Sequence, residues 1–151
     1  MKLSIQRIDD SLPLPSYQTK GSVAFDLYVR ESVAIEPFEP VVVPTNLIVK
    51  VPAGFVLLLG SRSSLPLKKK LMIANSVGVI DQDYSGPQDE IGVELLNFSK
   101  KTVMIERGER IAQAMLVPIA RVEEFVEVKM EGESRGGFGS TGSDLYKKEP
   151  A

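Results

Sequence analysis

The side chains that could do chemistry lie in short polar segments between apolar runs, and the first such segment is 60–64, Gly-Ser-Arg-Ser-Ser. Arg62 offers a planar fork that fits a phosphate, and the hydroxyls of Ser63 and Ser64, with N–H groups at a helix start, would complete an anion site. A serine-rich helix cap beside a solvated arginine has the same composition. From this segment alone the two interpretations are equally good.

A second segment, from Asn75 to Gly86, contains the carboxylates Asp81 and Asp83. A carboxylate can act as a general base in a protein of any fold. Aspartate is also common in turns, because its side chain bonds to the local backbone. Taken alone, this segment therefore favours a turn.

Two smaller candidates are Asp26 and the run 108–110, Gly-Glu-Arg. Asp26 interrupts the apolar run 24–28, so it lies either at a strand edge or beside partners that satisfy its charge. The run 108–110 is typical of a turn with a surface ion pair. Each is compatible with ordinary structure.

The glycine-rich segment 136–142, Gly-Gly-Phe-Gly-Ser-Thr-Gly, lies close to the end of the chain. Glycines allow backbone N–H groups to approach an anion, and Ser140 and Thr141 add hydroxyl donors. Composition alone favours a flexible linker. Phe138 favours an arm that closes over a ligand, because a lone ring in a linker has nothing to stack on.

The chain of 151 residues has no histidine and no cysteine. This excludes Ser-His-Asp triads, Cys-His pairs, disulfides and most catalytic zinc sites. Catalysis would have to use carboxylates, arginine, lysine, tyrosine, hydroxyls or a hard metal ion. Phosphoanhydride chemistry with Mg²⁺ fits that set, because Mg²⁺ takes oxygen ligands, often from substrate phosphates and water.

The net charge of -2 and the pI near 5.3 argue against a protein that coats nucleic acid, which needs a large basic excess. No apolar stretch approaches the roughly 20 residues that span a bilayer, and the N-terminus has no signal-peptide core. We therefore expect a cytoplasmic protein with neither a nucleic acid nor a membrane as partner.

Short apolar runs separated by turn residues predict an all-β protein, jelly-roll-like, built as a β-barrel or sandwich. At most one short helix is expected, in the range 63–70. From about residue 131 little remains to bury, which predicts a β domain over 1–130 and a flexible glycine-rich C-terminal arm over 131–151. The predicted strands are 4–8, 24–29, 41–43, 47–51, 55–59, 71–74, 91–96, 102–105, 112–117 and 122–128.

Taken in order, the polar segments resemble the five sequence motifs of the homotrimeric dUTPase family, from Ala24 to Gly142. The closest matches are 78–84 (Gly-Val-Ile-Asp-Gln-Asp-Tyr), 110–113 (Arg-Ile-Ala-Gln) and 136–142. The resemblance implies a jelly-roll homotrimer that hydrolyses dUTP to dUMP and pyrophosphate with Mg²⁺. Each active site would be shared between subunits, with the arm of one subunit closing over the nucleotide of another.

The resemblance also implies a role for individual residues. Asp81 would activate the water that attacks the α-phosphorus, and Tyr84 would pack under the deoxyribose and exclude a 2′-hydroxyl. Asp26 would lie near Mg²⁺, reached through water. The residues implied to bind the substrate are Arg62, Ser63, Ser64, Asn75, Gly78, Tyr84, Gln113, Arg135, Phe138, Gly139, Ser140 and Thr141.

The sequence departs from the family pattern at several positions and leaves two other functions open. Glu133 stands where the arm usually has an arginine, the run 87–91 is longer than usual, and Lys70 replaces a common glycine. The run 94–97, Glu-Leu-Leu-Asn, is similar to the catalytic stretch of the related dCTP deaminases, although Glu94 also fits a surface strand position. The other alternative is a non-catalytic nucleotide-binding module.

Overall fold

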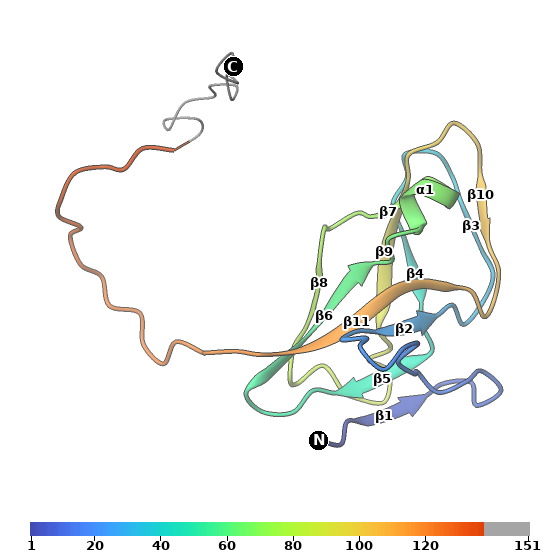
Figure 1. The fold of residues 1–151 in the computed structure, drawn as a ribbon, viewed down its shortest axis with the longest axis horizontal. Helices are drawn as coiled ribbons and strands as arrows, with labels where there is room; N and C mark the ends of the chain where they lie inside the picture. The colour runs from blue at the N-terminus through green and yellow to red at the C-terminus, as the bar shows by residue number, and fades with distance from the viewer. Residues whose placement is uncertain (138–151) are drawn as a thin grey trace, which may run out of the picture. The chain divides into compact units, whose positions relative to one another are not determined.

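The structure, a computed structural model, describes residues 1–137 and is nearly all β within them (Figure 1). This confirms the predicted fold class of a jelly-roll-like sandwich. The elements are β1 (Ser4–Arg7), β2 (Phe25–Tyr28), β3 (Val33–Ile35), β4 (Val41–Pro44), β5 (Leu47–Lys50), β6 (Phe55–Ser61), α1 (Leu65–Lys69), β7 (Leu71–Ile73), β8 (Gly78–Ile80), β9 (Gly92–Asn97), β10 (Val103–Ile105) and β11 (Arg110–Pro118).

The strands pair antiparallel in two larger sheets and two strand pairs. One sheet has the order β2-β11-β6-β8 and the other β4-β9-β7, while β1 pairs with β5 and β10 with β3. In the four-stranded sheet, Gln113 of β11 lies between Asp26 of β2 and Gly60 of β6. The three segments that were singled out at 24–28, 60–64 and 110–113 therefore meet in one sheet.

Alternating side chains place the core between the sheets. On β9, Val93 and Leu95 are buried while Glu94 between them is partly exposed, and on β6 Leu57 and Leu59 are buried. This is the period-two pattern of strands with one face on a core. The compact unit ends at Arg121, and the residues from Val122 onward are grouped separately. The arm proposed over 131–151 stays a prediction.

The structure confirms the predicted helix but contradicts one predicted strand. The helix forms as α1, with Pro66 in its first turn, where proline is tolerated. The strand predicted at 122–128 is wrong, since these residues form no strand and are exposed. No other strand in the described part of the chain pairs with them, and a strand needs such a partner. The strands β3 and β8, three residues each, were not predicted.

Within residues 1–137, no helix is long and apolar enough to cross a membrane.

Candidate active site

A buried carboxylate holds two arginines together at one end of the four-stranded sheet. Asp26 lies on β2 with only 9% of its side chain exposed. Its Oδ1 accepts Arg62 Nε at 2.9 Å, and its Oδ2 accepts Arg110 Nη1 at 2.9 Å. β2 is an outer strand of the four-stranded sheet, and Asp26 has charged partners as well. The sequence had left open whether Asp26 has partners, and it has two.

The cluster of Asp26, Arg62 and Arg110 keeps an excess of positive charge. Two guanidinium groups face one carboxylate, and their side chains remain 29% and 37% exposed. Arg62 also donates from Nη1 to the Arg110 carbonyl at 3.1 Å, so its orientation is fixed from two sides. Guanidinium groups fixed in this way and open to solvent are suited to bind phosphate oxygens.

Gln113 and the serines of segment 60–64 lie at the same end of β6. Gln113 is partly buried and donates from Nε2 to the Ser61 carbonyl at 2.9 Å, which leaves its side-chain oxygen available as an acceptor. Ser63 is exposed, and the Ser64 hydroxyl makes no capping bond to α1. The helix-cap interpretation of these serines is therefore not supported by the contacts of Ser64.

The turn between β7 and β8 carries Asn75 and Gly78 on a small hollow that Glu94 also lines. Asn75 is exposed, whereas Gly78 pairs with Leu59 of β6. A side chain at position 78 would lie 2.9 Å from Leu59, so glycine is required by the close approach of β8 to β6. Glu94 is partly exposed between two buried neighbours, as the surface-strand interpretation predicted.

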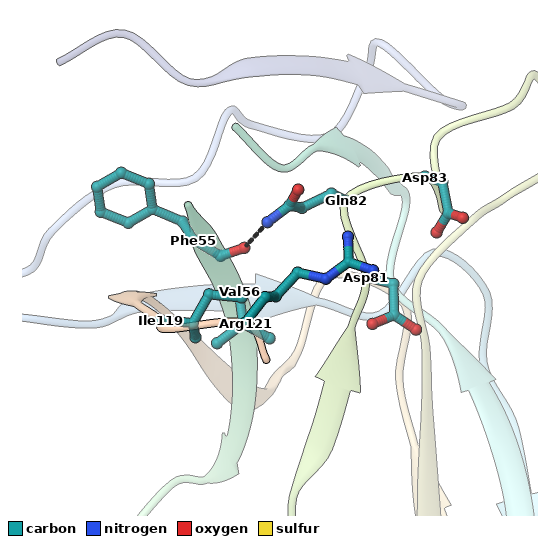
Figure 2. Close-up of a pocket in the computed structure, with 7 residues that line it drawn as sticks. All are labelled: Phe55, Val56, Asp81, Gln82, Asp83, Ile119 and Arg121. Carbon is teal, nitrogen blue, oxygen red and sulfur yellow. Dashed lines mark hydrogen bonds between the residues drawn. The ribbon is translucent and has the colours of Figure 1, made fainter. Parts of the chain in front are cut away.

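Asp81 follows directly after β8 and is exposed. It lines a pocket of about 490 Å³ together with Phe55, Gln82, Asp83, Ile119 and Arg121 (Figure 2). Gln82 donates from Nε2 to the Phe55 carbonyl at 3.0 Å and so fastens the segment after β8 to the start of β6. Asp81 is thus an accessible carboxylate on an anchored segment, as a general base must be.

Tyr84 lies three residues further along and is 40% exposed. Its hydroxyl donates to the backbone carbonyl of Glu90 at 3.1 Å. One face of the ring can therefore meet a ligand while its hydroxyl is held by the protein.

The arginine cluster and Asp81 lie at opposite ends of β6. Ile80 pairs with Leu57 near the start of the strand, whereas Ser61, at its end, pairs with Ala112 and leads directly to Arg62. The six residue-to-residue steps from position 56 to position 62 span roughly 20 Å in an extended strand. One chain therefore holds the arginine cluster and Asp81 far apart along β6.

The predicted residues of the C-terminal arm are only partly described. Arg135 is exposed. Phe138, Gly139, Ser140 and Thr141 lie outside the described residues.

Two arginines were missed as individual site residues. Arg110 had been read as half of a surface ion pair with Glu109, but Glu109 bonds to Lys69 at 2.6 Å and Arg110 to Asp26. The buried charge of Asp26 was the signal that could have found it, because such a charge requires cationic partners. Arg121, which lines the pocket of Asp81, had no signal in the sequence.

The carboxylates of the described residues are the candidate protein ligands for a metal ion. They include no group of three or more placed to hold one. Both oxygens of Asp26 already accept bonds from arginine, so an ion bound directly to Asp26 would have to displace a guanidinium. A water-bridged contact with Asp26 does not have that requirement.

Comparison of this sequence with known proteins gives one consistent family. A family model described as dUTPase matches residues 10–142. The chain is 44% identical over 145 residues to the deoxyuridine 5'-triphosphate nucleotidohydrolase of Hydrogenobaculum sp. (strain Y04AAS1), a match that covers 94% of this chain and 99% of that protein.

Solved structures give the same result. The crystal structure of dUTPase from Streptococcus mutans superposes with a TM-score of 0.73 at 35% identity, covering 80% of this chain and 98% of that one. A mutant dUTPase from phage phi11 of S. aureus, described as revealing the coordination of a structural Mg(II) ion, superposes with a TM-score of 0.74 at 25% identity. That match covers 86% of this chain and 98% of the phage protein.

Proposed function

The chain belongs to the dUTPase family and is a dUTP nucleotidohydrolase, and we propose that it cleaves dUTP to dUMP and pyrophosphate through a water molecule activated by Asp81. The reaction would supply dUMP for thymidylate synthesis, and by removing dUTP it would limit the incorporation of uracil into DNA. The observation that carries the proposed chemistry is a pair of features at the two ends of β6, an arginine cluster with excess positive charge and the exposed carboxylate of Asp81.

Asp81 is the proposed general base. It is exposed, and within residues 1–137 no ion pair neutralises it. A free carboxylate beside the α-phosphorus can orient a water molecule and accept its proton as the water attacks. The chain has no histidine to take this role.

We propose that the arginine cluster binds the triphosphate of the substrate. Arg62 and Arg110 are oriented by Asp26 and by each other, so little side-chain freedom is lost when an anion binds. Gln113, Ser63 and Ser64, at the same end of β6, would add hydrogen bonds to phosphate oxygens. Charge stabilisation of this kind helps phosphoryl-type transition states in general.

Mg²⁺ is the proposed cofactor, held by the triphosphate oxygens and by water. When bound it would neutralise phosphate charge. The contacts of Asp26 support this arrangement, because both of its oxygens are engaged by arginine and only a water-bridged contact is open to it.

The base and the sugar would be recognised by the segment from β7 to Tyr84. Asn75, exposed in the turn after β7, and the backbone at Gly78 would bind the edge of uracil, and Tyr84 would lie against the deoxyribose. Arg135, Phe138, Gly139, Ser140 and Thr141 are proposed to close over the nucleotide as part of the arm 131–151.

We propose that the active protein is a homotrimer with shared active sites. The separation of Arg62 and Asp81 along β6 supports this, because a second copy of the chain could supply the half of the site that one copy cannot place nearby. A closed symmetric trimer would then contain three equivalent sites.

A nucleotide panel tests the proposed reaction. The protein is incubated with Mg²⁺ and with dUTP, dTTP, UTP or dCTP, and the products are separated by chromatography. We expect dUMP and pyrophosphate from dUTP and much slower conversion of dTTP and UTP. Formation of dUTP from dCTP would instead establish a deaminase in which Glu94 is the candidate catalytic carboxylate, and an unchanged panel would leave only a nucleotide-binding role.

A further inference from the structure

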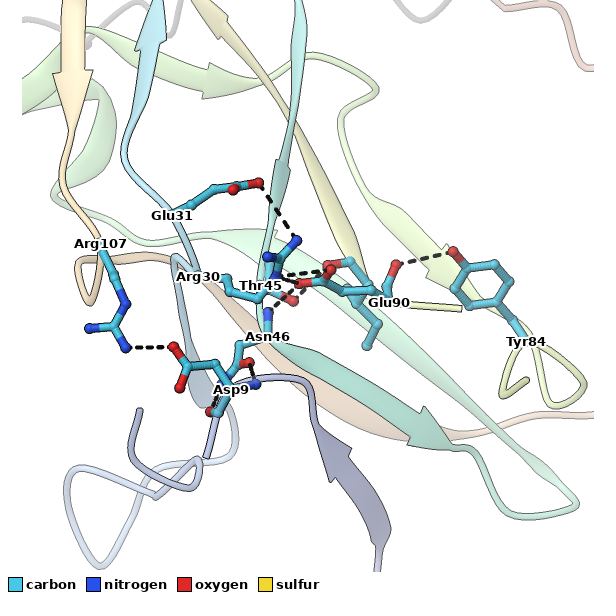
Figure 3. Close-up of polar contacts among 9 residues, drawn as sticks. Asp9, Arg30, Glu31, Thr45, Asn46, Tyr84, Glu90 and Arg107 are labelled. Atoms are coloured by element: carbon cyan, nitrogen blue, oxygen red, sulfur yellow. Dashed lines mark hydrogen bonds and ion pairs between the residues drawn. The ribbon is translucent and has the colours of Figure 1, made fainter. Parts of the chain in front are cut away.

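The orientation of the Tyr84 ring depends on one hydrogen bond to a distant part of the loop that follows it. Tyr84 is 40% exposed, and its hydroxyl donates to the Glu90 carbonyl at 3.1 Å (Figure 3). The position of that carbonyl therefore determines where the ring can lie.

The Glu90 carbonyl is itself held from both sides. The Glu90 carboxylate accepts Arg30 Nε with both oxygens, at 2.9 and 3.1 Å, and accepts the backbone N–H of Asn46 at 2.8 Å. On the other side, the Ile91 N–H donates to Leu47 at 2.8 Å, and the Ile91 carbonyl accepts the Thr45 hydroxyl at 2.7 Å. The peptide group between residues 90 and 91 has little freedom to move.

The network continues into the body of the fold through Asn46. This residue is 2% exposed and has a φ of 69°, a left-handed conformation that asparagine tolerates. It exchanges two hydrogen bonds with the Asp9 backbone, at 2.6 and 2.9 Å. Asp9 in turn pairs with Arg107 at 2.6 Å, and the hydrogen bonds from Arg107 and Ser11 hold the pKa of Asp9 well below its usual range.

The Arg30–Glu90 contact is a strong one for a partly exposed pair. Their side chains are 28% and 18% exposed, and hydrogen bonding to Glu90 raises the pKa of Arg30. Arg30 also approaches Glu31 at 3.6 Å, but the Glu31 side chain is 60% exposed and is not hydrogen-bonded to Asn46 or Tyr84. Glu90 is therefore the residue through which the network reaches Tyr84.

We propose that Glu90 is a positioning residue for sugar discrimination, and that the Arg30–Glu90 pair sets the selectivity for dUTP over UTP by fixing the Tyr84 ring. This inference rests on the proposed packing of Tyr84 against the deoxyribose. A ring can exclude an added 2′-hydroxyl only if it cannot move away, because a shift of a fraction of an ångström relieves the overlap. Anchoring the hydroxyl prevents that shift.

The test compares kcat/KM for dUTP and for UTP in the full-length protein and three variants. These are Glu90→Gln, which keeps the side-chain size but removes the charge, Tyr84→Phe, which removes only the hydroxyl, and the double variant. We expect each single change to lower the dUTP/UTP ratio of kcat/KM by about 10-fold. The double variant should show the same loss as Tyr84→Phe alone, because both changes act through one hydrogen bond.

Glu31→Gln is the matched control. It removes the same charge next to the same arginine without touching Asn46 or Tyr84, so the dUTP/UTP ratio should equal that of the unmodified protein. If Glu90→Gln does not fold, Arg30→Lys replaces it, since lysine keeps the charge but lacks the Nε–H group that bonds to both carboxylate oxygens. The ratio should again fall.

Three outcomes separate the inference from the function on which it rests. The role of Glu90 is supported if the dUTP/UTP ratio of kcat/KM falls in both single variants and falls no further in the double variant. An unchanged ratio in a folded Glu90 or Arg30 variant, or losses that multiply in the double variant, overturns it while leaving the role of Tyr84 intact. If the unmodified protein does not discriminate against UTP, the proposed role of Tyr84 fails as well.

Discussion

Asp26 shows how far a single residue can be interpreted from sequence. A charge inside an apolar run predicted either an edge position or buried partners, and the structure has two partners. The sequence could not say which cations these would be, because Arg62 and Arg110 lie far along the chain and meet Asp26 only when β2, β11 and β6 align. The apolar neighbours of Asp26 indicated that a buried charge would need partners, but the alignment of the strands determined which residues these partners are.

Asp26→Asn should reduce both stability and substrate binding. The substitution keeps the shape but leaves two guanidinium groups facing each other without a carboxylate, which should cost about 2–4 kcal/mol of unfolding free energy. We expect kcat/KM for dUTP to fall by roughly 10- to 100-fold, because the arginines lose their fixed orientation. Urea unfolding and steady-state kinetics measure the two effects.

Glu109→Gln provides the comparison for Asp26→Asn. It breaks the neighbouring ion pair with Lys69, in which both side chains are 31% exposed, and leaves the arginine cluster intact. A loss below about 1 kcal/mol and an unchanged kcat/KM are expected. Equal kcat/KM values in the Asp26 and Glu109 variants would mean that Asp26 does not organise the phosphate site.

The elements of the fold were predicted best where apolar side chains alternate over a core. The runs at 55–59 and 91–96 correspond to β6 and β9, whose buried residues include Leu57, Leu59, Val93 and Leu95. The three-residue strands β3 and β8 were missed, whereas the equally short β7 and β10 were predicted, so a run of this length is a poor signal in either direction. The run 122–128 has the pattern of a strand but no partner in the described chain.

Lys70, at the end of α1, is expected to limit the stability of this element. It adopts a left-handed conformation, with φ of 56° and ψ of 34°, which costs a residue with a β-carbon energy that glycine does not lose. Lys70→Gly should raise the unfolding free energy by about 0.5–1 kcal/mol, measured by urea unfolding.

Lys68→Gly is the control within the same helix. Its position is helical, so the substitution should lower the unfolding free energy by about 1 kcal/mol. If both variants lose stability, the left-handed conformation of Lys70 carries no appreciable strain.

At the scale of the whole molecule, the length of β6 separates Arg62 from Asp81, two residues that we propose act on the same nucleotide. The resemblance implied a site shared between subunits, but local sequence patterns could not show that residues 62 and 81 lie at opposite ends of one strand. The antiparallel return of β8 along β6 places Asp81 at the start of the strand, away from Arg62 at its end.

The proposed sharing of sites predicts complementation between two inactive variants. Arg62→Ala and Asp81→Asn should each abolish turnover of dUTP. When the two are unfolded together and refolded as mixed trimers, about one quarter of the sites should combine an intact Arg62 with an intact Asp81 from different subunits. Recovery of a corresponding fraction of the activity, with mixed assembly verified by native mass spectrometry, is the expected result.

A second mixture controls for simple restoration by refolding. Arg62→Ala and Arg110→Ala damage the same cluster, so no combination of these chains yields an intact phosphate site. This mixture should stay inactive. Mixed trimers of the first pair that remain inactive would contradict the shared site.

The length of β6 also ties catalysis to the concentration of the protein. In the proposed trimer, each chain carries every residue type that the site needs, but no chain forms a complete site alone. Dissociation would therefore remove all activity even if each chain stays folded. Activity per chain would fall on dilution as assembly is lost. The contacts between subunits would therefore be as necessary for activity as the catalytic residues. In a cell with few copies of the enzyme, those contacts must be strong enough to keep the subunits associated.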